Sequence, residues 1–144
     1  MISFTNTIRI NRSPSDIYAY LSDLEHTPEW NWAIAETTKT TQGPVAIGTR
    51  YRQTRTVPAP ATESLEISSL DANRHIEVQG TLAAMRARLD YELTEVGDGT
   101  EIVNTVQLEP QGALRLAGPI VGPRIKSAVA SNLADLKTRL EEQR

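Results

Sequence analysis

Cysteine is absent from the 144 residues, which excludes disulfides, thiolate nucleophiles, zinc–thiolate sites and iron–sulfur clusters. Only two histidines are present, so no metal site can be built from three histidines of one chain. No apolar run approaches the length of about 18 residues that a transmembrane helix needs, and no basic segment precedes an apolar stretch at the N-terminus. We therefore expect no membrane span, no signal peptide and a cytoplasmic location.

Charge of one sign is not in large excess either. The 15 Lys and Arg residues face 18 Asp and Glu residues, for a net charge of −3, which is unlike a general nucleic-acid binder. The sequence also lacks a glycine-rich phosphate loop, a nucleophile elbow and a zinc-peptidase motif. His26 and His75 fall in a helix–strand connection and beside a turn, which does not favour a joint site. We expect no nucleic-acid partner, no cofactor and no metal.

The first 32 residues predict a strand followed by two short helical segments. Residues 2–10 alternate apolar and polar side chains, which is typical of a half-buried strand. Ser13 and Pro14 suit the N-cap and first position of a helix over about 14–24. Residues 25–32 predict a second short helical turn or loop.

The rest of the chain predicts six strands and one long helix. The strands span about 33–40, 47–57, 61–70, 73–80, 82–95 and 100–109, and turn residues separate most of them. Apolar residues then recur at helical spacing from Leu116 to Leu140, and two prolines place the start of the regular helix near 120–123 and its end near 141. Helices segregated on one face of an antiparallel sheet indicate an α+β fold, which we assign to a single domain over residues 1–144.

Five short segments carry a family resemblance, in this order along the chain: 8–14 (IRINRSP), 18–23 (YAYLSD), 28–30 (PEW), 48–51 (GTRY) and 132–137 (NLADLK). Together with the order of elements they resemble the polyketide cyclase/dehydrase-like branch of the START and birch-pollen-allergen superfamily, over essentially the whole chain. The resemblance implies a helix-grip fold, in which a curved seven-stranded antiparallel sheet wraps around the long C-terminal helix, with two short helices after the first strand. It also implies a cavity between sheet and C-terminal helix for a small hydrophobic ligand, such as a lipid or polyketide. Assembly into a homodimer is left open.

Strand parity selects polar residues that share the inward face with apolar ones. A buried polar group needs a partner, so we expect these side chains to pair with one another, with water or with a ligand. The residues chosen in this way are Tyr51, Gln53, Arg55, Glu63, Tyr91 and Asn104. Met85 joins them as an inward-facing thioether that is either core or ligand contact, and Trp30 matches the family's Pro-x-Trp position near the cavity mouth. Trp30 is either a ring packed between helix and sheet or a lid that stacks on the ligand.

Arg55 and Glu63 flank the Pro58-Ala59-Pro60 turn at symmetric distances, as hairpin partners would. One interpretation is a cross-strand ion pair near the sheet end, worth less than about 1 kcal/mol if it is exposed. The other is a charged pair at the cavity wall that orients a ligand carboxylate or enolate, with Glu63 as a candidate base.

The resemblance, taken with these residues, leaves three functions open. The first is binding of a small hydrophobic or aromatic ligand. The second is a polyketide cyclase/dehydrase-type reaction on such a ligand, and the third is a protein-interaction module whose cavity is vestigial. A fold alone does not choose among them, because this superfamily holds cyclases, hydrolases and transport proteins on one scaffold. Catalysis predicts a polar residue with a perturbed pKa in the cavity.

Overall fold

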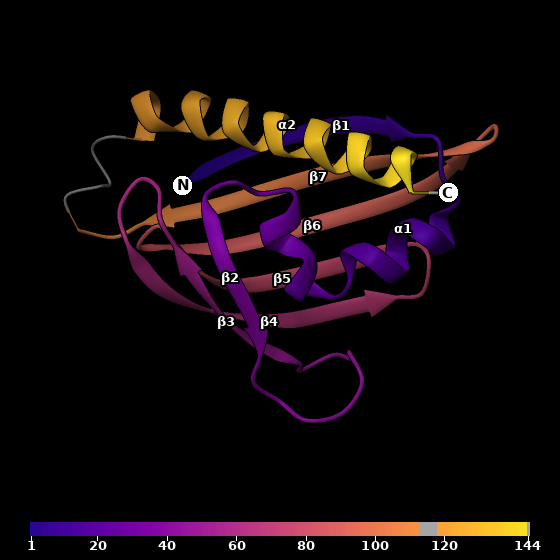
Figure 1. The fold of residues 1–144 in the computed structure, drawn as a ribbon. Coiled ribbons are helices and arrows are strands. Elements are labelled where there is room, and N and C mark those ends of the chain that lie inside the picture. The colour runs from indigo at the N-terminus through magenta and orange to yellow at the C-terminus, as the bar shows by residue number, and fades with distance from the viewer. Residues whose placement is uncertain (113–117, 144) are drawn as a thin grey trace.

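Seven antiparallel strands form one open sheet in the computed structural model, which describes residues 1–112 and 118–143. The strand order is β1-β7-β6-β5-β4-β3-β2, so every neighbour except β1 and β7 is also a neighbour along the chain. The strands are β1 (Ile2–Ile10), β2 (Ile34–Lys39), β3 (Arg50–Arg55), β4 (Ala61–Asp71), β5 (His75–Leu82), β6 (Met85–Val96) and β7 (Gly99–Pro110). Figure 1 shows how strongly this sheet curves.

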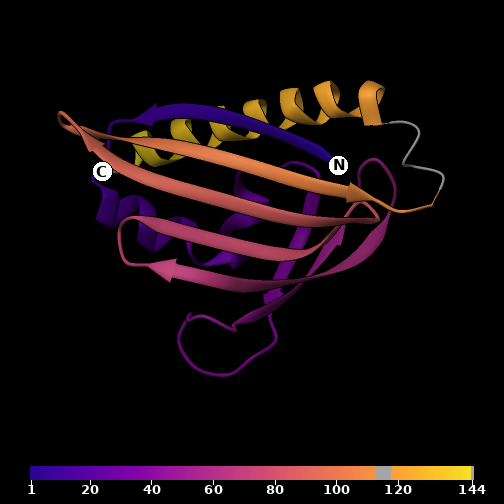
Figure 2. The same cartoon turned by 180° about the vertical axis from the view of Figure 1, so that it is seen from behind.

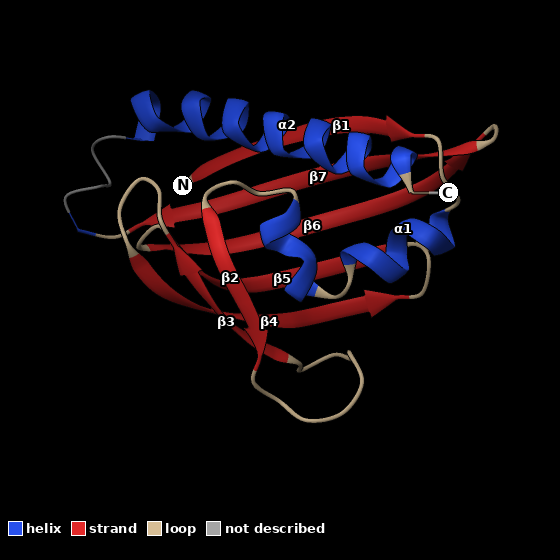
Figure 3. Cartoon of the chain, in the orientation of Figure 1, coloured by secondary structure: helices blue, strands red, loops and turns tan. Residues whose placement is uncertain are grey.

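The described helices cover one face of the sheet: α1 (Pro14–Leu21), the 3₁₀ helix η1 (Leu24–Glu29) and α2 (Gly118–Glu142). α2 packs along β1, while η1 packs against β2. Figure 3 shows all of them on the same side of the strands, and the reverse view in Figure 2 shows the sheet face that these described helices leave uncovered. Among the described residues, each helix is too short or too polar to cross a membrane.

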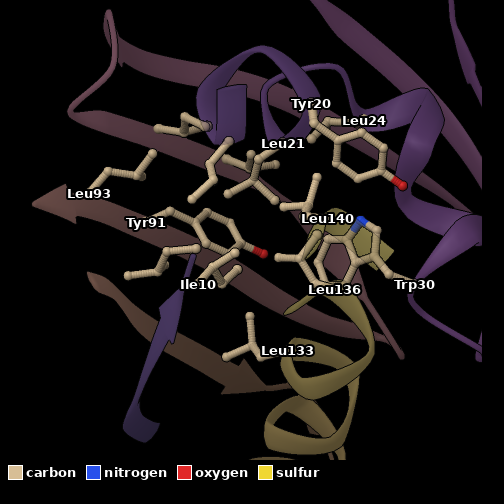
Figure 4. Packing of buried hydrophobic residues seen from close by; sticks show 14 of the residues in the cluster. Ile10, Tyr20, Leu21, Leu24, Trp30, Tyr91, Leu93, Leu133, Leu136 and Leu140 are labelled. Atoms are coloured by element: carbon tan, nitrogen blue, oxygen red, sulfur yellow. The ribbon is translucent and has the colours of Figure 1, made fainter. Parts of the chain in front are cut away.

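The main core lies between the sheet and the helices. Its fully buried members include Ile17 of α1, Ile67, Ile76 and Ile102 of the sheet, and Leu136 of α2. Figure 4 shows the part of this core where side chains from α1, β6 and α2 meet. A second cluster at the β1–β7 edge contains Ile2, Met85, Ala87, Val106 and Leu108.

The predicted elements are present, but three boundaries were wrong. The first helix ends at Leu21 instead of 24, because Asp23 accepts a hydrogen bond from the backbone of Glu25 and caps η1 as a separate segment. β3 begins at Arg50 instead of 47, after a turn in which Gly48 has φ +93°. α2 begins at Gly118 instead of 120–123, and the apolar position Leu116 lies outside the described residues.

The β5–β6 hairpin was also misplaced. Its turn is Ala83–Ala84, with φ values of 50° and 63°, so Leu82 ends β5 instead of beginning β6. Two consecutive residues with positive φ form the hairpin turn that glycine and asparagine usually supply. Alanine adopts this conformation at a cost of about 1–2 kcal/mol per residue. The surroundings must therefore hold this turn in place.

Candidate functional site

A cavity of about 60 Å³ lies between the sheet and the segment that runs from α1 to β2. Its wall combines residues of α1, η1 and the following loop with inward-facing residues of β2 to β6. They are Leu21, Leu24, Thr27, Trp30, Asn31, Ile34, Gln53, Arg55, Leu65, Val78, Leu82, Leu89 and Tyr91. Most of the lining is apolar.

The sequence predicted a cavity between the sheet and the C-terminal helix, whereas this cavity lies beneath α1 and η1. None of the described α2 residues lines it. The reason is packing, because Leu133, Leu136 and Leu140 are each at most 1% exposed and fill the space beneath α2. An open hollow of about 790 Å³ does lie between β1, the end of β7 and the start of α2, but it has none of the eight predicted site residues among its described lining.

Strand parity, in contrast, predicted the inward faces correctly. Tyr51 and Gln53 are buried on β3 and alternate with exposed Arg50 and Arg52. Four of the eight predicted residues line the cavity, namely Trp30, Gln53, Arg55 and Tyr91. Glu63 accepts hydrogen bonds from two of these residues, Gln53 and Arg55.

Glu63 is the centre of a buried polar cluster at the cavity wall. Its side chain is 2% exposed and accepts hydrogen bonds from three donors. Arg55 Nε lies 3.0 and 2.8 Å from the two carboxylate oxygens, Gln53 Nε2 lies 2.9 Å from Oε1, and the backbone N–H of Ala83 lies 2.5 Å from Oε2. The last bond ties Glu63 to the strained β5–β6 turn, so one carboxylate joins two strands and a hairpin turn.

Arg55 and Glu63 form a cross-strand ion pair, and it is buried, so the small energy of an exposed pair does not apply to it. The two residues are not direct hairpin partners either, because Glu63 is opposite Gln53, and Arg55 is opposite Ala61. They meet diagonally across β3 and β4. The exposed pair on these strands is Arg50–Glu66, whose side chains are 69% and 45% exposed.

Tyr91 lines the cavity from β6, and its hydroxyl makes no hydrogen bond to any residue the structure describes. The residue is 8% exposed, and burial alone raises the pKa of its hydroxyl far above the ordinary value. In Figure 4 its hydroxyl is directed toward the α2 leucines Leu136 and Leu140. A buried tyrosine usually finds a partner for its O–H. Tyr91 therefore offers an unused donor inside the molecule.

Removing the Tyr91 hydroxyl should leave the stability of the fold almost unchanged. We expect Tyr91→Phe to change the free energy of unfolding by less than about 0.5 kcal/mol or to raise it, because no hydrogen bond to a described residue is lost. Tyr20→Phe is the matched control, since Tyr20 donates to Glu29 Oε1 at 2.5 Å and should lose about 1.5–3 kcal/mol. Urea unfolding of both variants measures the difference. Equal losses in the two would show that the Tyr91 hydroxyl is engaged in the fold.

The remaining predicted residues are buried outside the cavity wall. Tyr51 is 1% exposed, and burial together with the negative charge of Asp23 raises the pKa of Tyr51 to about 12. Met85 belongs to the second core cluster. Asn104 donates from Nδ2 to the backbone oxygen of Asp90 at 3.1 Å, while its Oδ1 has no partner among the described residues.

Several contributors to the site were not among the predicted site residues. Leu24, Thr27 and Asn31 line the cavity from η1 and its following loop, a segment whose pattern predicted only a short turn or loop. Ala83 contributes a backbone N–H, which no side-chain pattern can indicate.

Comparison with known proteins agrees with this architecture. A family model described as "Polyketide cyclase / dehydrase and lipid transport" matches residues 1–141. No match was found by searching curated proteins. A START superfamily protein from Mycobacterium smegmatis superposes with a TM-score of 0.86 at 15% identity over 100% of both chains. TTHA0849 from Thermus thermophilus superposes with a TM-score of 0.77 at 18% identity over 96% of each chain.

A third solved structure is the di-domain ARO/CYC StfQ from the steffimycin biosynthetic pathway. Its TM-score is 0.80 at 15% identity, over 99% of this chain and 51% of that one. At such identities these likenesses show the fold alone. They confirm the predicted curved seven-stranded sheet with a long C-terminal helix.

Proposed function

This chain belongs to the polyketide cyclase/dehydrase and lipid-transport family, and on that premise we propose that it binds a small hydrophobic or aromatic ligand carrying a polar group. The binding site is the cavity beneath α1 and η1. The observation that carries the proposal is the Tyr91 hydroxyl, which has no partner among the described residues and belongs to a side chain that lines this largely apolar cavity. A ligand oxygen that accepts from Tyr91 would satisfy this donor.

Arg55 supports a polar group on the ligand as well. Its Nε is committed to Glu63 and its Nη1 donates to the Val57 backbone oxygen at 3.2 Å, whereas Nη2 makes no hydrogen bond within the described part of the chain. Tyr91 and Arg55 are both donors, so the complementary ligand group is an acceptor, such as a carbonyl, phenolate or carboxylate oxygen.

The cavity must enlarge when the ligand binds. Its volume of about 60 Å³ has room for a few water molecules, whereas binding pockets usually measure about 300–1,000 Å³. The side chains of Trp30 and Leu82 line the cavity from a loop and from the end of β5, next to the strained Ala83–Ala84 turn. We expect these two side chains to move when the ligand binds. The free energy needed to open the cavity then lowers the apparent affinity for the ligand.

Fluorescence can test this proposal with the probe 8-anilinonaphthalene-1-sulfonate, which pairs an aromatic body with acceptor oxygens. Trp32→Phe removes the exposed tryptophan and leaves Trp30, which lines the cavity, as the reporter. We expect one probe per chain, quenching of Trp30, and an affinity about 5-fold or more lower in Tyr91→Phe, since a hydrogen bond contributes about 1 kcal/mol.

Tyr20→Phe is the control for this binding experiment, because its hydroxyl bonds Glu29. Its probe affinity should equal that of the parent protein. Probe binding that leaves Trp30 fluorescence unchanged, or that is equally strong in Tyr91→Phe, would place the probe outside the cavity and contradict the proposal.

A cyclase/dehydrase reaction is the second candidate, and the raised pKa of Tyr91 favours it. A phenol that stays protonated can donate to a carbonyl oxygen and stabilise the negative charge that develops there. In such a cyclisation an enol carbon of the ligand bonds to that carbonyl carbon, the oxygen takes up a proton, and water leaves in the dehydration. Incubation with a poly-β-ketone analogue tests this step, since turnover lowers its mass by one water and binding alone does not.

A further inference from the structure

We infer that the sheet face left uncovered by the described helices carries a binding site for a divalent transition metal of the zinc type, formed by His75, Asp90 and Glu92. One ligating atom from each side chain lies within 4.8 Å of the other two. This site is separate from the ligand cavity, because these residues alternate along β5 and β6 with inward-facing Ile76 and Tyr91. Figure 2 shows β5 and β6 side by side in the view of this face.

The strand register explains why these three side chains converge. His75 lies directly opposite Glu92 in the β5–β6 pair, and Asp90 comes two residues before Glu92 on β6, on the same face. His75 Nε2 already lies 2.8 Å from Asp90 Oδ2. Two ligating atoms of one metal ion are separated by a distance similar to this one, since each metal–ligand bond is about 2.0–2.2 Å long. A small rearrangement of exposed Glu92 would complete the set.

The donor set selects the class of metal. An imidazole nitrogen with two carboxylate oxygens suits Zn²⁺ and its neighbours, whereas Mg²⁺ and Ca²⁺ prefer oxygen ligands alone. Ser69 Oγ lies 3.5 Å from His75 Nδ1, the ring nitrogen that is not bonded to Asp90. A polar partner on that nitrogen helps to orient a metal-binding histidine.

Space and charge next to the cluster also suit a cation. A hollow of about 270 Å³ adjoins Asp90 and Glu92, so water can complete the coordination. Glu77 and Arg88 line the same hollow. Their oppositely charged groups are 3.8 Å apart, so their charges balance each other. Asp90 and Glu92 then supply two carboxylate groups beside the His75 ring, an arrangement that attracts a divalent ion.

Zinc titration of the protein without an affinity tag tests the site. We expect one equivalent of Zn²⁺ to bind, and to raise the melting temperature, since a ligand of the native state stabilises it. His75→Ala should weaken the affinity at least about 10-fold and abolish the thermal shift. His26→Ala is the matched control, because His26 is the other histidine and pairs with the carboxylate of Glu29 instead.

Asp90→Asn and Glu92→Gln keep the proposal testable if the histidine variant does not fold. Each should weaken Zn²⁺ binding while circular dichroism stays unchanged. Zinc affinity that is equal in the parent, His75→Ala and Glu92→Gln would overturn the assignment. So would the absence of saturable binding below about 1 mM Zn²⁺.

Discussion

Replacing Glu63 with glutamine should lower the free energy of unfolding by about 3–5 kcal/mol, because it removes the charge opposite a buried arginine. The Arg55 side chain is 12% exposed and Glu63 is 2% exposed, so little water can take over the lost interaction. The amide that replaces the carboxylate also brings a donor toward the N–H of Ala83, which the carboxylate accepts at 2.5 Å. Denaturant unfolding of the variant measures the loss.

Glu66→Gln is the matched control on the same strand. Its pair with Arg50 is largely exposed, so we expect a loss of less than about 1 kcal/mol. The double variant Arg55→Met with Glu63→Leu should recover much of the stability, because no unpaired charge is left in the interior. A loss in Glu63→Gln no larger than in Glu66→Gln would contradict the buried character of the cluster.

Replacing Leu136 with alanine should cost about 2–5 kcal/mol, because the side chain is fully buried where α2 meets the sheet. Leu136 packs in the same cluster as Trp30 and Tyr91, and Figure 4 shows these side chains close to one another. The deleted atoms leave a void that neighbouring side chains fill only in part. Thermal or urea unfolding gives the size of the loss.

Asp135→Ala provides the control for this helix, since Asp135 precedes Leu136 and is exposed. We expect a change within about 0.5 kcal/mol. If Leu136→Ala lowered the free energy of unfolding no more than the control does, the buried leucines would not be what holds α2 on the sheet.

The sequence predicted the number and order of elements because their patterns are local. Alternation along β3 placed Tyr51, Gln53 and Arg55 inward, and the turn Gly97-Asp98 marked the hairpin between β6 and β7. Ser13 Oγ accepts from the backbone N–H of Asp16, as its N-cap position predicts. Each of these features depends on a few adjacent residues.

Features that depend on the pairing of distant residues were predicted less well. Arg55 and Glu63 meet diagonally because the hairpin centre is one residue from the position that symmetry suggested. The turn at Ala83–Ala84 has no glycine or asparagine to indicate it. The convergence of His75 with Asp90 and Glu92 appears only once the β5–β6 register is known.

The size and position of the cavity could not be predicted for a related reason. Cavity volume is the small remainder after side chains from several elements have packed. The space beneath α2 is occupied by Leu133, Leu136 and Leu140. A small cavity remains beside η1, between Leu21, Trp30 and Tyr91. Periodicity shows that these residues face inward and says nothing about how tightly they meet.

Native mass spectrometry tests the central claim most directly. Freshly purified parent protein and Tyr91→Phe are incubated with the same extract of cellular small molecules and compared before and after denaturation. We expect a 1:1 complex with one molecule of defined mass, which is released on denaturation and less populated in Tyr91→Phe. Parent protein without a bound molecule at saturating extract, or equal occupancy in both proteins, would contradict ligand binding in this cavity.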